Sequence, residues 1–326
     1  MEKKSIIRCE NLRKIYRIGD EKVVALNNIN LDILQGQICC IVGTSGSGKS
    51  TLLNQLAGLE KPTKGCVYIG KTNISTLNEN QLATFRQRYL GFVFQSYNLL
   101  PTMTAMENVA LPLEFKGYPK SKRNKIAMKM LENVGLKKRA RHKPTEMSGG
   151  QQQRVGIARA FVSNPKVIFA DEPTGNLDTK TTIDVMQTMV GFARKYNETL
   201  IIVTHDPELA DYADRVITLI DGNITNDYTH VPIFEREGYV PVPRLSETKE
   251  EAPSEKTNSP SLPQENSAPR QEEGALPLEE ETGKIPVEIP VESFSETQDA
   301  AENPKPQEDG FCFEIQEEIP SDHVEI

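Results

Sequence analysis

A glycine-rich segment carries the residue types that bind phosphate. It follows an apolar run that ends at Val42, and a segment of helical composition, Ser50 to Leu56, begins where it ends. Glycines let successive backbone N–H groups turn inward around an anion, and the positive end of a following helix adds to the attraction. Lys49 is therefore expected to reach the β- and γ-phosphates of a nucleoside triphosphate, with Ser50 binding Mg²⁺. The predicted nucleotide-binding residues here are Gly43, Thr44, Ser45, Gly46, Ser47, Gly48, Lys49, Ser50 and Thr51.

Two adjacent carboxylates follow a second apolar run. Val167 to Ala170 is expected to be a buried strand, and Asp171 and Glu172 come directly after it. An open α/β sheet binds its ligands at the carboxyl ends of its strands. Asp171 is expected to hold Mg²⁺ through water, and Glu172 to polarise the water that attacks the γ-phosphate. Two acids after a strand usually form a solvated turn, but a phosphate loop on another strand favours the catalytic interpretation.

The elements that must position these residues alternate along the first 230 residues. Short β-branched runs, such as Leu200 to Val203, are separated by segments of helical periodicity. This alternation predicts an α/β fold with a largely parallel sheet. Val23 to Leu34 partly alternates apolar and polar residues, as a half-exposed strand does. Cys39 and Cys40 lie on a predicted buried strand and are expected to be small core residues.

Three local patterns predict further elements. Ala127, Met130, Leu131 and Val134 share one apolar helix face. Residues 104–107, Thr-Ala-Met-Glu, fit a capping box at a helix start. Residues 221–223, Asp-Gly-Asn, lie between two apolar strands and indicate a hairpin turn.

The charge of the chain is divided between two regions. Residues 231–326 hold 24 of the 46 acidic residues, 7 of the 38 basic ones and 13 of the 21 prolines. Their net charge is −17, which leaves the first 230 residues at +9. Apolar residues are too sparse in this region to offset the entropy of ordering, so we predict a globular domain over 1–230 and a disordered acidic tail over 231–326.

Composition also limits the class of protein. An apolar run near the ~20 residues of a membrane span does not occur, and the N-terminus lacks an apolar signal core. The five cysteines match neither a disulfide framework nor a paired zinc site. The basic run Lys137 to Lys143 lacks interleaved aromatics, so a solvated face is favoured over a nucleic-acid site. These features predict a protein of the reducing cytosol that does not bind nucleic acid.

Residues 147–151, Met-Ser-Gly-Gly-Gln, identify the family. They resemble the signature sequence of the ATP-binding cassette (ABC) ATPases, with Met where Leu is commonest. The other family motifs follow in order over roughly residues 4–228. They are an aromatic that stacks on adenine (Tyr16), the glutamine loop (Gln95), the loop after the acidic pair (Gly175 to Asp178) and the switch histidine (His205).

The resemblance implies a role for each motif. Glu172, His205 and Gln95 are expected to be catalytic, and Ser50, Gln95 and Asp171 to hold the metal. Tyr16 and Asp178 are expected to contact the nucleotide. Ser148, Gly149, Gly150 and Gln151 would face the ATP held by a second subunit.

The resemblance also implies an architecture and an assembly. It predicts a P-loop ATPase core with an N-terminal antiparallel β region and a helical insertion over about 95–153. Two copies would sandwich two ATP molecules with Mg²⁺ and drive a separate integral-membrane permease from the cytoplasmic face of the membrane.

The stretch from Phe92 to Leu113 most resembles the lipoprotein-release and macrolide-export subclass, as does Tyr16 followed by Val23 to Leu26. That subclass also contains antimicrobial-peptide exporters and a cell-division pair, and the sequence does not separate them. Soluble ABC ATPases of DNA repair or translation remain an alternative. They usually carry a coiled coil, zinc modules or a second cassette, and none of these is visible here.

Overall fold

The strands of the described chain form two sheets. The computed structural model describes residues 4–236. A four-stranded antiparallel sheet has the order β2-β1-β4-β5, and a six-stranded sheet has the order β10-β9-β3-β8-β7-β6. In the larger sheet only β10 runs antiparallel to its neighbour. The bounds are β1 Ser5–Ile18, β2 Glu21–Leu34, β3 Ile38–Val42, β4 Lys64–Ile69, β5 Thr72–Asn73, β6 Leu90–Phe94, β7 Val167–Asp171, β8 Thr199–Thr204, β9 Arg215–Ile220 and β10 Asn223–Thr229.

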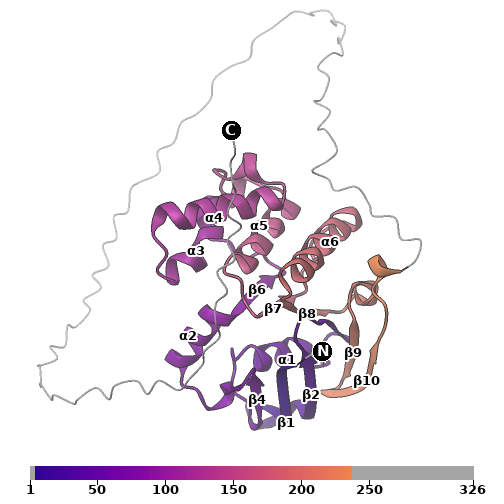
Figure 1. Ribbon diagram of the computed structural model, residues 1–326. Helices are drawn as coiled ribbons and strands as arrows, with labels where there is room; N and C mark the ends of the chain where they lie inside the picture. The colour runs from indigo at the N-terminus through magenta and orange to yellow at the C-terminus, as the bar shows by residue number, and fades with distance from the viewer. Residues whose placement is uncertain (1–3, 237–326) are drawn as a thin grey trace, which may run out of the picture. The chain divides into compact units, whose positions relative to one another are not determined.

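The helices divide between the two faces of the larger sheet. Figure 1 shows α3, α4 and α5 gathered on the side away from β1, β2 and β4. The α-helices are α1 Lys49–Leu56, α2 Glu79–Tyr89, α3 Ala105–Phe115, α4 Lys120–Asn133, α5 Gly149–Phe161 and α6 Thr179–Tyr196. Short 3₁₀ helices are η1 Ile74–Thr76, η2 Lys137–Arg139, η3 Pro144–Glu146, η4 Pro207–Tyr212 and η5 Ile233–Glu235. The predicted helical insertion is present as α3, α4 and the start of α5.

Strand β3 is buried on both faces, and its side chains alternate between two cores. Ile38 and Cys40 pack with residues of α3 to α6, whereas Cys39 and Ile41 pack with α1 and the antiparallel sheet. All four side chains are fully buried. This double burial explains why the strand is continuously apolar in sequence.

Local sequence patterns account for several element ends. Thr104 accepts a hydrogen bond from the Glu107 N–H, and the Glu107 side chain accepts one from the Thr104 N–H, which confirms the predicted capping box. The predicted apolar face of α4 and the residues after it is buried. The predicted turn at 221–223 joins β9 to β10.

The chain continues to pack on the body after residue 230. We call residues 230–236 the C-terminal strap. The His230 N–H donates to the Asp214 carbonyl at 3.0 Å, and its Nε2 lies 3.1 Å from the Ala210 carbonyl oxygen. Pro232 is buried, and Ile233 packs against the core on the α6 side of the sheet.

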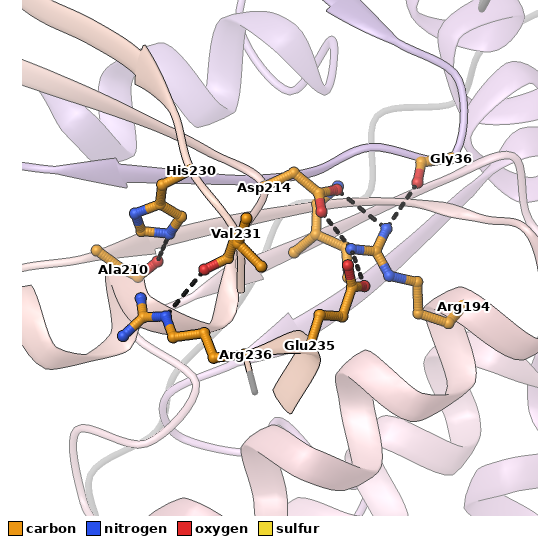
Figure 2. Close-up of polar contacts among 9 residues, drawn as sticks. Gly36, Arg194, Ala210, Asp214, His230, Val231, Glu235 and Arg236 are labelled. Atoms are coloured by element: carbon orange, nitrogen blue, oxygen red, sulfur yellow. Dashed lines mark hydrogen bonds and ion pairs between the residues drawn. The ribbon is translucent and has the colours of Figure 1, made fainter. Parts of the chain in front are cut away.

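Ion pairs attach the end of the strap, and Figure 2 shows the pair between Arg194 and Glu235. Arg194, in the last turn of α6, forms an ion pair with Asp214, and its guanidinium also lies 3.2 Å from Glu235. Arg236 pairs with Asp211 of η4 at 2.7 Å. The strap therefore ties α6, η4 and the start of β9 together.

The predicted disorder of the acidic tail concerns residues that lie almost entirely outside the described range, so it stays a prediction. Within residues 4–236, no helix combines the length and apolarity that a membrane crossing requires.

Candidate nucleotide-binding site

Four of the predicted motifs follow four neighbouring parallel strands. The phosphate loop starts at Gly43 after β3, His205 follows β8, Glu172 follows β7, and Gln95 follows β6. Because these strands are adjacent in the order β3-β8-β7-β6, their carboxyl ends place the motifs along one edge of the sheet. The chain order of the motifs differs from this spatial order.

Hydrogen bonds within the phosphate loop and close packing against Ala25 of β2 determine its conformation. The Lys49 ammonium donates to the carbonyls of Gly43 (2.9 Å) and Thr44 (3.1 Å). Gly48 has a left-handed φ of 88°, and a Cβ there would lie 2.2 Å from the Ala25 carbonyl oxygen. Only glycine fits this position, where the backbone turns into α1. The loop therefore presents its N–H groups at the N-terminus of that helix.

A cleft of ≈ 600 Å³ opens beside this loop, a volume typical of small-molecule sites. Predicted residues from four separate parts of the chain line it together: Tyr16, Ser45, Gly46, Gly48, Lys49, Ser50, Thr51, Glu172 and His205. The structure therefore brings the phosphate loop, Glu172 and Tyr16 to one cavity.

Ser50 and Asp171 provide a donor set suited to Mg²⁺. The Ser50 hydroxyl lies 3.4 Å from Asp171 Oδ1. Burial raises the pKa of the Asp171 carboxyl, and the neighbouring Glu172 charge raises it further. A divalent cation would stabilise the neighbouring, partly buried carboxylates of Asp171 and Glu172. Mg²⁺ accepts hydroxyl and carboxylate oxygens while keeping several waters, so these residues fit the ion.

Glu172 accepts hydrogen bonds from the residue after β8. Its Oε1 lies 3.0 Å from the His205 backbone N and 2.9 Å from His205 Nδ1. The Glu172 side chain is 15% exposed, whereas that of His205 is 63% exposed. The carboxylate is thus held at the cleft edge, while the imidazole borders open solvent.

Tyr16, on β1, lines the cleft. Its hydroxyl donates to Glu60 Oε2 at 2.7 Å, and the Lys14 ammonium lies 5.1 Å from the ring centroid. Burial raises the pKa of the Tyr16 hydroxyl, and the Glu60 contact adds to this effect. These contacts hold the Tyr16 side chain at the cleft, and its stacking on a base stays a prediction.

The signature residues lie outside the cleft lining. Ser148 is the N-cap of α5 and forms a capping box with Gln151. A Cβ on Gly150 would lie 2.4 Å from the Thr181 side chain, so α5 begins beside α6. Asp178 caps α6 by accepting from the Thr181 N–H at 3.0 Å. Two helix N-termini outside the cleft lining thus hold Ser148, Gly149, Gly150, Gln151 and Asp178.

Gln95 also lies outside the cleft lining. A Cβ on Gly175 would lie 2.8 Å from Gln95 Nε2, and the Asn176 amide donates to the Gln95 carbonyl at 3.2 Å. Its side chain is thus directed at the loop after the acidic pair. The metal and catalytic roles predicted for Gln95 stay predictions.

The sequence reasoning missed five lining residues: Val23, Val24, Ala25, Asp221 and Gly222. Val23 is the cross-strand partner of Tyr16, so antiparallel pairing of the predicted N-terminal strands could have placed it there. Gly222 donates its N–H to the Ser47 carbonyl at 2.9 Å, so the β9–β10 turn supports the phosphate loop. The Asp-Gly pattern predicted that turn but did not indicate that the turn contacts the phosphate loop.

Comparison with known proteins identifies the family. The family model described as "ABC transporter" matches residues 26–175. The ABC transporter ATP-binding protein MJ1508 of Methanocaldococcus jannaschii is 52% identical over 219 residues, covering 67% of this chain and 97% of that protein. The lipoprotein-releasing system ATP-binding protein LolD of Geobacter metallireducens is 46% identical, covering 68% and 99%. The macrolide export ATP-binding/permease protein MacB of Vibrio parahaemolyticus is 42% identical, covering 74% of this chain and 37% of that protein.

Solved structures agree with this assignment. The ATP-binding cassette MJ0796, in a dimeric post-hydrolysis state with ADP and Pi, has a TM-score of 0.65 and 42% identity and covers 69% of this chain and 98% of that chain. A second dimeric structure of MJ0796 matches with the same TM-score and 43% identity. The predicted α/β cassette fold and the resemblance to the lipoprotein-release and macrolide-export group are confirmed. The chain belongs to the ATP-binding proteins of ABC transporters.

Proposed function

We propose that this chain hydrolyses ATP as the motor subunit of an export-type ABC transporter, acting as a homodimer on a separate permease. The proposal rests on one observation: the motifs are divided between the cleft and a helix N-terminus outside it. The phosphate loop, Glu172 and His205 share one cleft, whereas the helix N-terminus at Ser148 lies outside it. A helix N-terminus attracts anions, so it suits the phosphates of a nucleotide held by a second copy.

The predicted residues at and beside the cleft have separate roles in this proposal. The loop N–H groups and Lys49 bind the β- and γ-phosphates. Ser50 and Asp171 would hold Mg²⁺, which supplies charge neutralisation on the phosphate oxygens. Glu172 accepts the proton of the attacking water, and Tyr16 stacks on the base. His205 is exposed enough to turn from Glu172 toward the γ-phosphate.

Loss of the γ-phosphate would then remove the charge that joins the two copies. ATP binding brings the copies together and hydrolysis separates them, which gives a mechanical cycle. The relatives named for lipoprotein release and macrolide export support a permease of that type. Attachment to such a permease would place the chain at the cytoplasmic face of the membrane.

Purification from detergent-solubilised membranes tests the partner. The tagged full-length chain should retain a protein with several membrane spans, and the yield should rise in Glu172→Gln with ATP. Retention of ribosomes or nucleic acid in its place would contradict the transport proposal.

A further inference from the structure

The last residue of β8 places a buried hydroxyl against the proposed general base. Thr204 is 1% exposed, and its Oγ1 lies 3.2 Å from Glu172 Oε2. The Asp206 N–H donates to the same Oγ1 at 3.0 Å. That bond uses a lone pair of the oxygen and leaves the hydroxyl proton free to be donated. A carboxylate only accepts, so Thr204 is the donor to Glu172.

Thr204 differs from the other side-chain donor to this carboxylate. His205 contacts the opposite oxygen, Oε1, and its imidazole is 63% exposed. An exposed imidazole can exchange one partner for another at little cost. A buried hydroxyl has no such alternative, because leaving Glu172 would leave its proton unpaired. When the imidazole turns away, the Thr204 hydroxyl is the side-chain donor that stays.

The backbone of Glu172 also depends on the end of β8. Glu172 has a left-handed φ of 45°, a conformation that is unfavourable for a residue with a Cβ. Its N–H donates to the Val203 carbonyl at 2.8 Å. The end of β8 therefore holds both the backbone and the carboxylate of Glu172 in one arrangement.

We propose that Thr204 is a positioning residue for ATP hydrolysis, whose buried hydroxyl fixes the orientation of the Glu172 carboxylate after His205 has turned away. This inference rests on the proposed role of Glu172 as the proton acceptor. Orientation of a reacting group contributes strongly to rate, and small displacements have large effects. Thr204 is not among the residues that line the cleft, so its effect is expected to pass through Glu172.

Substitutions in β8 distinguish the positioning role of Thr204 from a general contribution to packing. Thr204→Val keeps the shape and removes the hydroxyl, and Thr204→Ser keeps the hydroxyl. Thr199 is fully buried at the other end of β8, where its Oγ1 accepts from the Gly36 N–H, so Thr199→Val is the matched control. We expect Thr204→Val to lower kcat by about tenfold, with the Kd for Mg-ATP unchanged within about twofold. Thr204→Ser and Thr199→Val should stay within about twofold of wild type in kcat.

A second measurement identifies the residue through which Thr204 acts. With Mg-ATP, Thr204→Val should increase the fraction of dimer measured by light scattering, because hydrolysis is slower. In the Glu172→Gln background, adding Thr204→Val should change neither turnover nor dimer fraction. If Thr204→Val does not fold, Thr204→Ala provides the same comparison.

Three results would overturn the inference. A wild-type kcat in Thr204→Val would refute the positioning role. If Glu172→Gln is inactive in the same assay, the proposed function would stay intact. A weaker ATP-dependent dimer in Glu172→Gln with Thr204→Val would show that the hydroxyl acts through Asp206 and His205. Full turnover in Glu172→Gln would refute the role of Glu172, and this inference with it.

Discussion

Replacing the buried carboxyl group of Glu198 should change how stability depends on pH. Glu198, directly before β8, is 3% exposed, and neither of its carboxylate oxygens has a hydrogen-bond partner among the described residues. Burial raises its pKa from 4.5 to about 8, against a lowering effect of Lys166. Between pH 4.5 and about pH 8, the Glu198 carboxyl is protonated in the folded state and ionised in the unfolded state.

The sign and size of the effect follow from this difference. Below the unfolded pKa both states are protonated, so the contribution of the neutral carboxyl is fully present. As pH rises toward the folded pKa of about 8, stability falls by up to ~1.4 kcal/mol per pH unit, and above it both states are ionised. Between pH 6 and pH 8 the loss is ~2 kcal/mol, because half of the folded molecules are already ionised at the upper limit.

Glu198→Gln should remove this dependence of the unfolding free energy on pH. We expect the difference in unfolding free energy between the variant and wild type to grow by ~2 kcal/mol in favour of the variant from pH 6 to pH 8. Urea unfolding followed by far-ultraviolet circular dichroism suits a chain without tryptophan. The control is Glu21→Gln, at an exposed strand end. Parallel curves for Glu198→Gln and wild type over this pH range would refute the reasoning.

Two further predictions concern the phosphate loop and the strap. Lys49→Ala should weaken Mg-ATP binding to the isolated chain by about tenfold or more, because it removes the cation facing the phosphates; titration with a fluorescent nucleotide measures it, and Lys22→Ala is the surface control. A chain ending after Thr229 should lose ~2–3 kcal/mol of unfolding free energy relative to one ending after Arg236, because it loses the burial of Pro232 and Ile233 and two ion pairs. Equal unfolding curves for the two chains would show that the strap adds no stability.

Much of the larger sheet and its loop could be predicted from sequence. Strands buried on both faces are continuous apolar runs, so β3, β7 and β8 were visible as Ile38, Val167 and Leu200 with their neighbours. The phosphate loop was visible because its glycines and Lys49 occupy fixed positions between a strand and a helix. The capping box of Thr104 and Glu107 was visible because its two partners are close in sequence.

The sequence did not reveal contacts between distant segments. The placement of β8 between β3 and β7 decides that His205 meets Glu172, and strand order leaves no local pattern. Thr204 looked like any strand residue, because its role depends on the Glu172 side chain 32 positions away. The end of the globular part was predicted at residue 230, while residues up to 236 are held by Arg194 and Asp211. That boundary and the disordered tail stay predictions.

The central claim is that each ATP site needs the phosphate loop of one copy and the helix N-terminus at Ser148 of another. The most direct test is the mass of Glu172→Gln, with and without Ser148→Arg, measured by light scattering in Mg-ATP. Glu172→Gln should accumulate as a dimer, because its hydrolysis is ~10²–10⁴-fold slower. The double variant should bind Mg-ATP equally well yet remain a monomer, since an arginine would occupy the place of the second nucleotide's phosphates. A double variant that dimerises on ATP as readily as Glu172→Gln would contradict the claim.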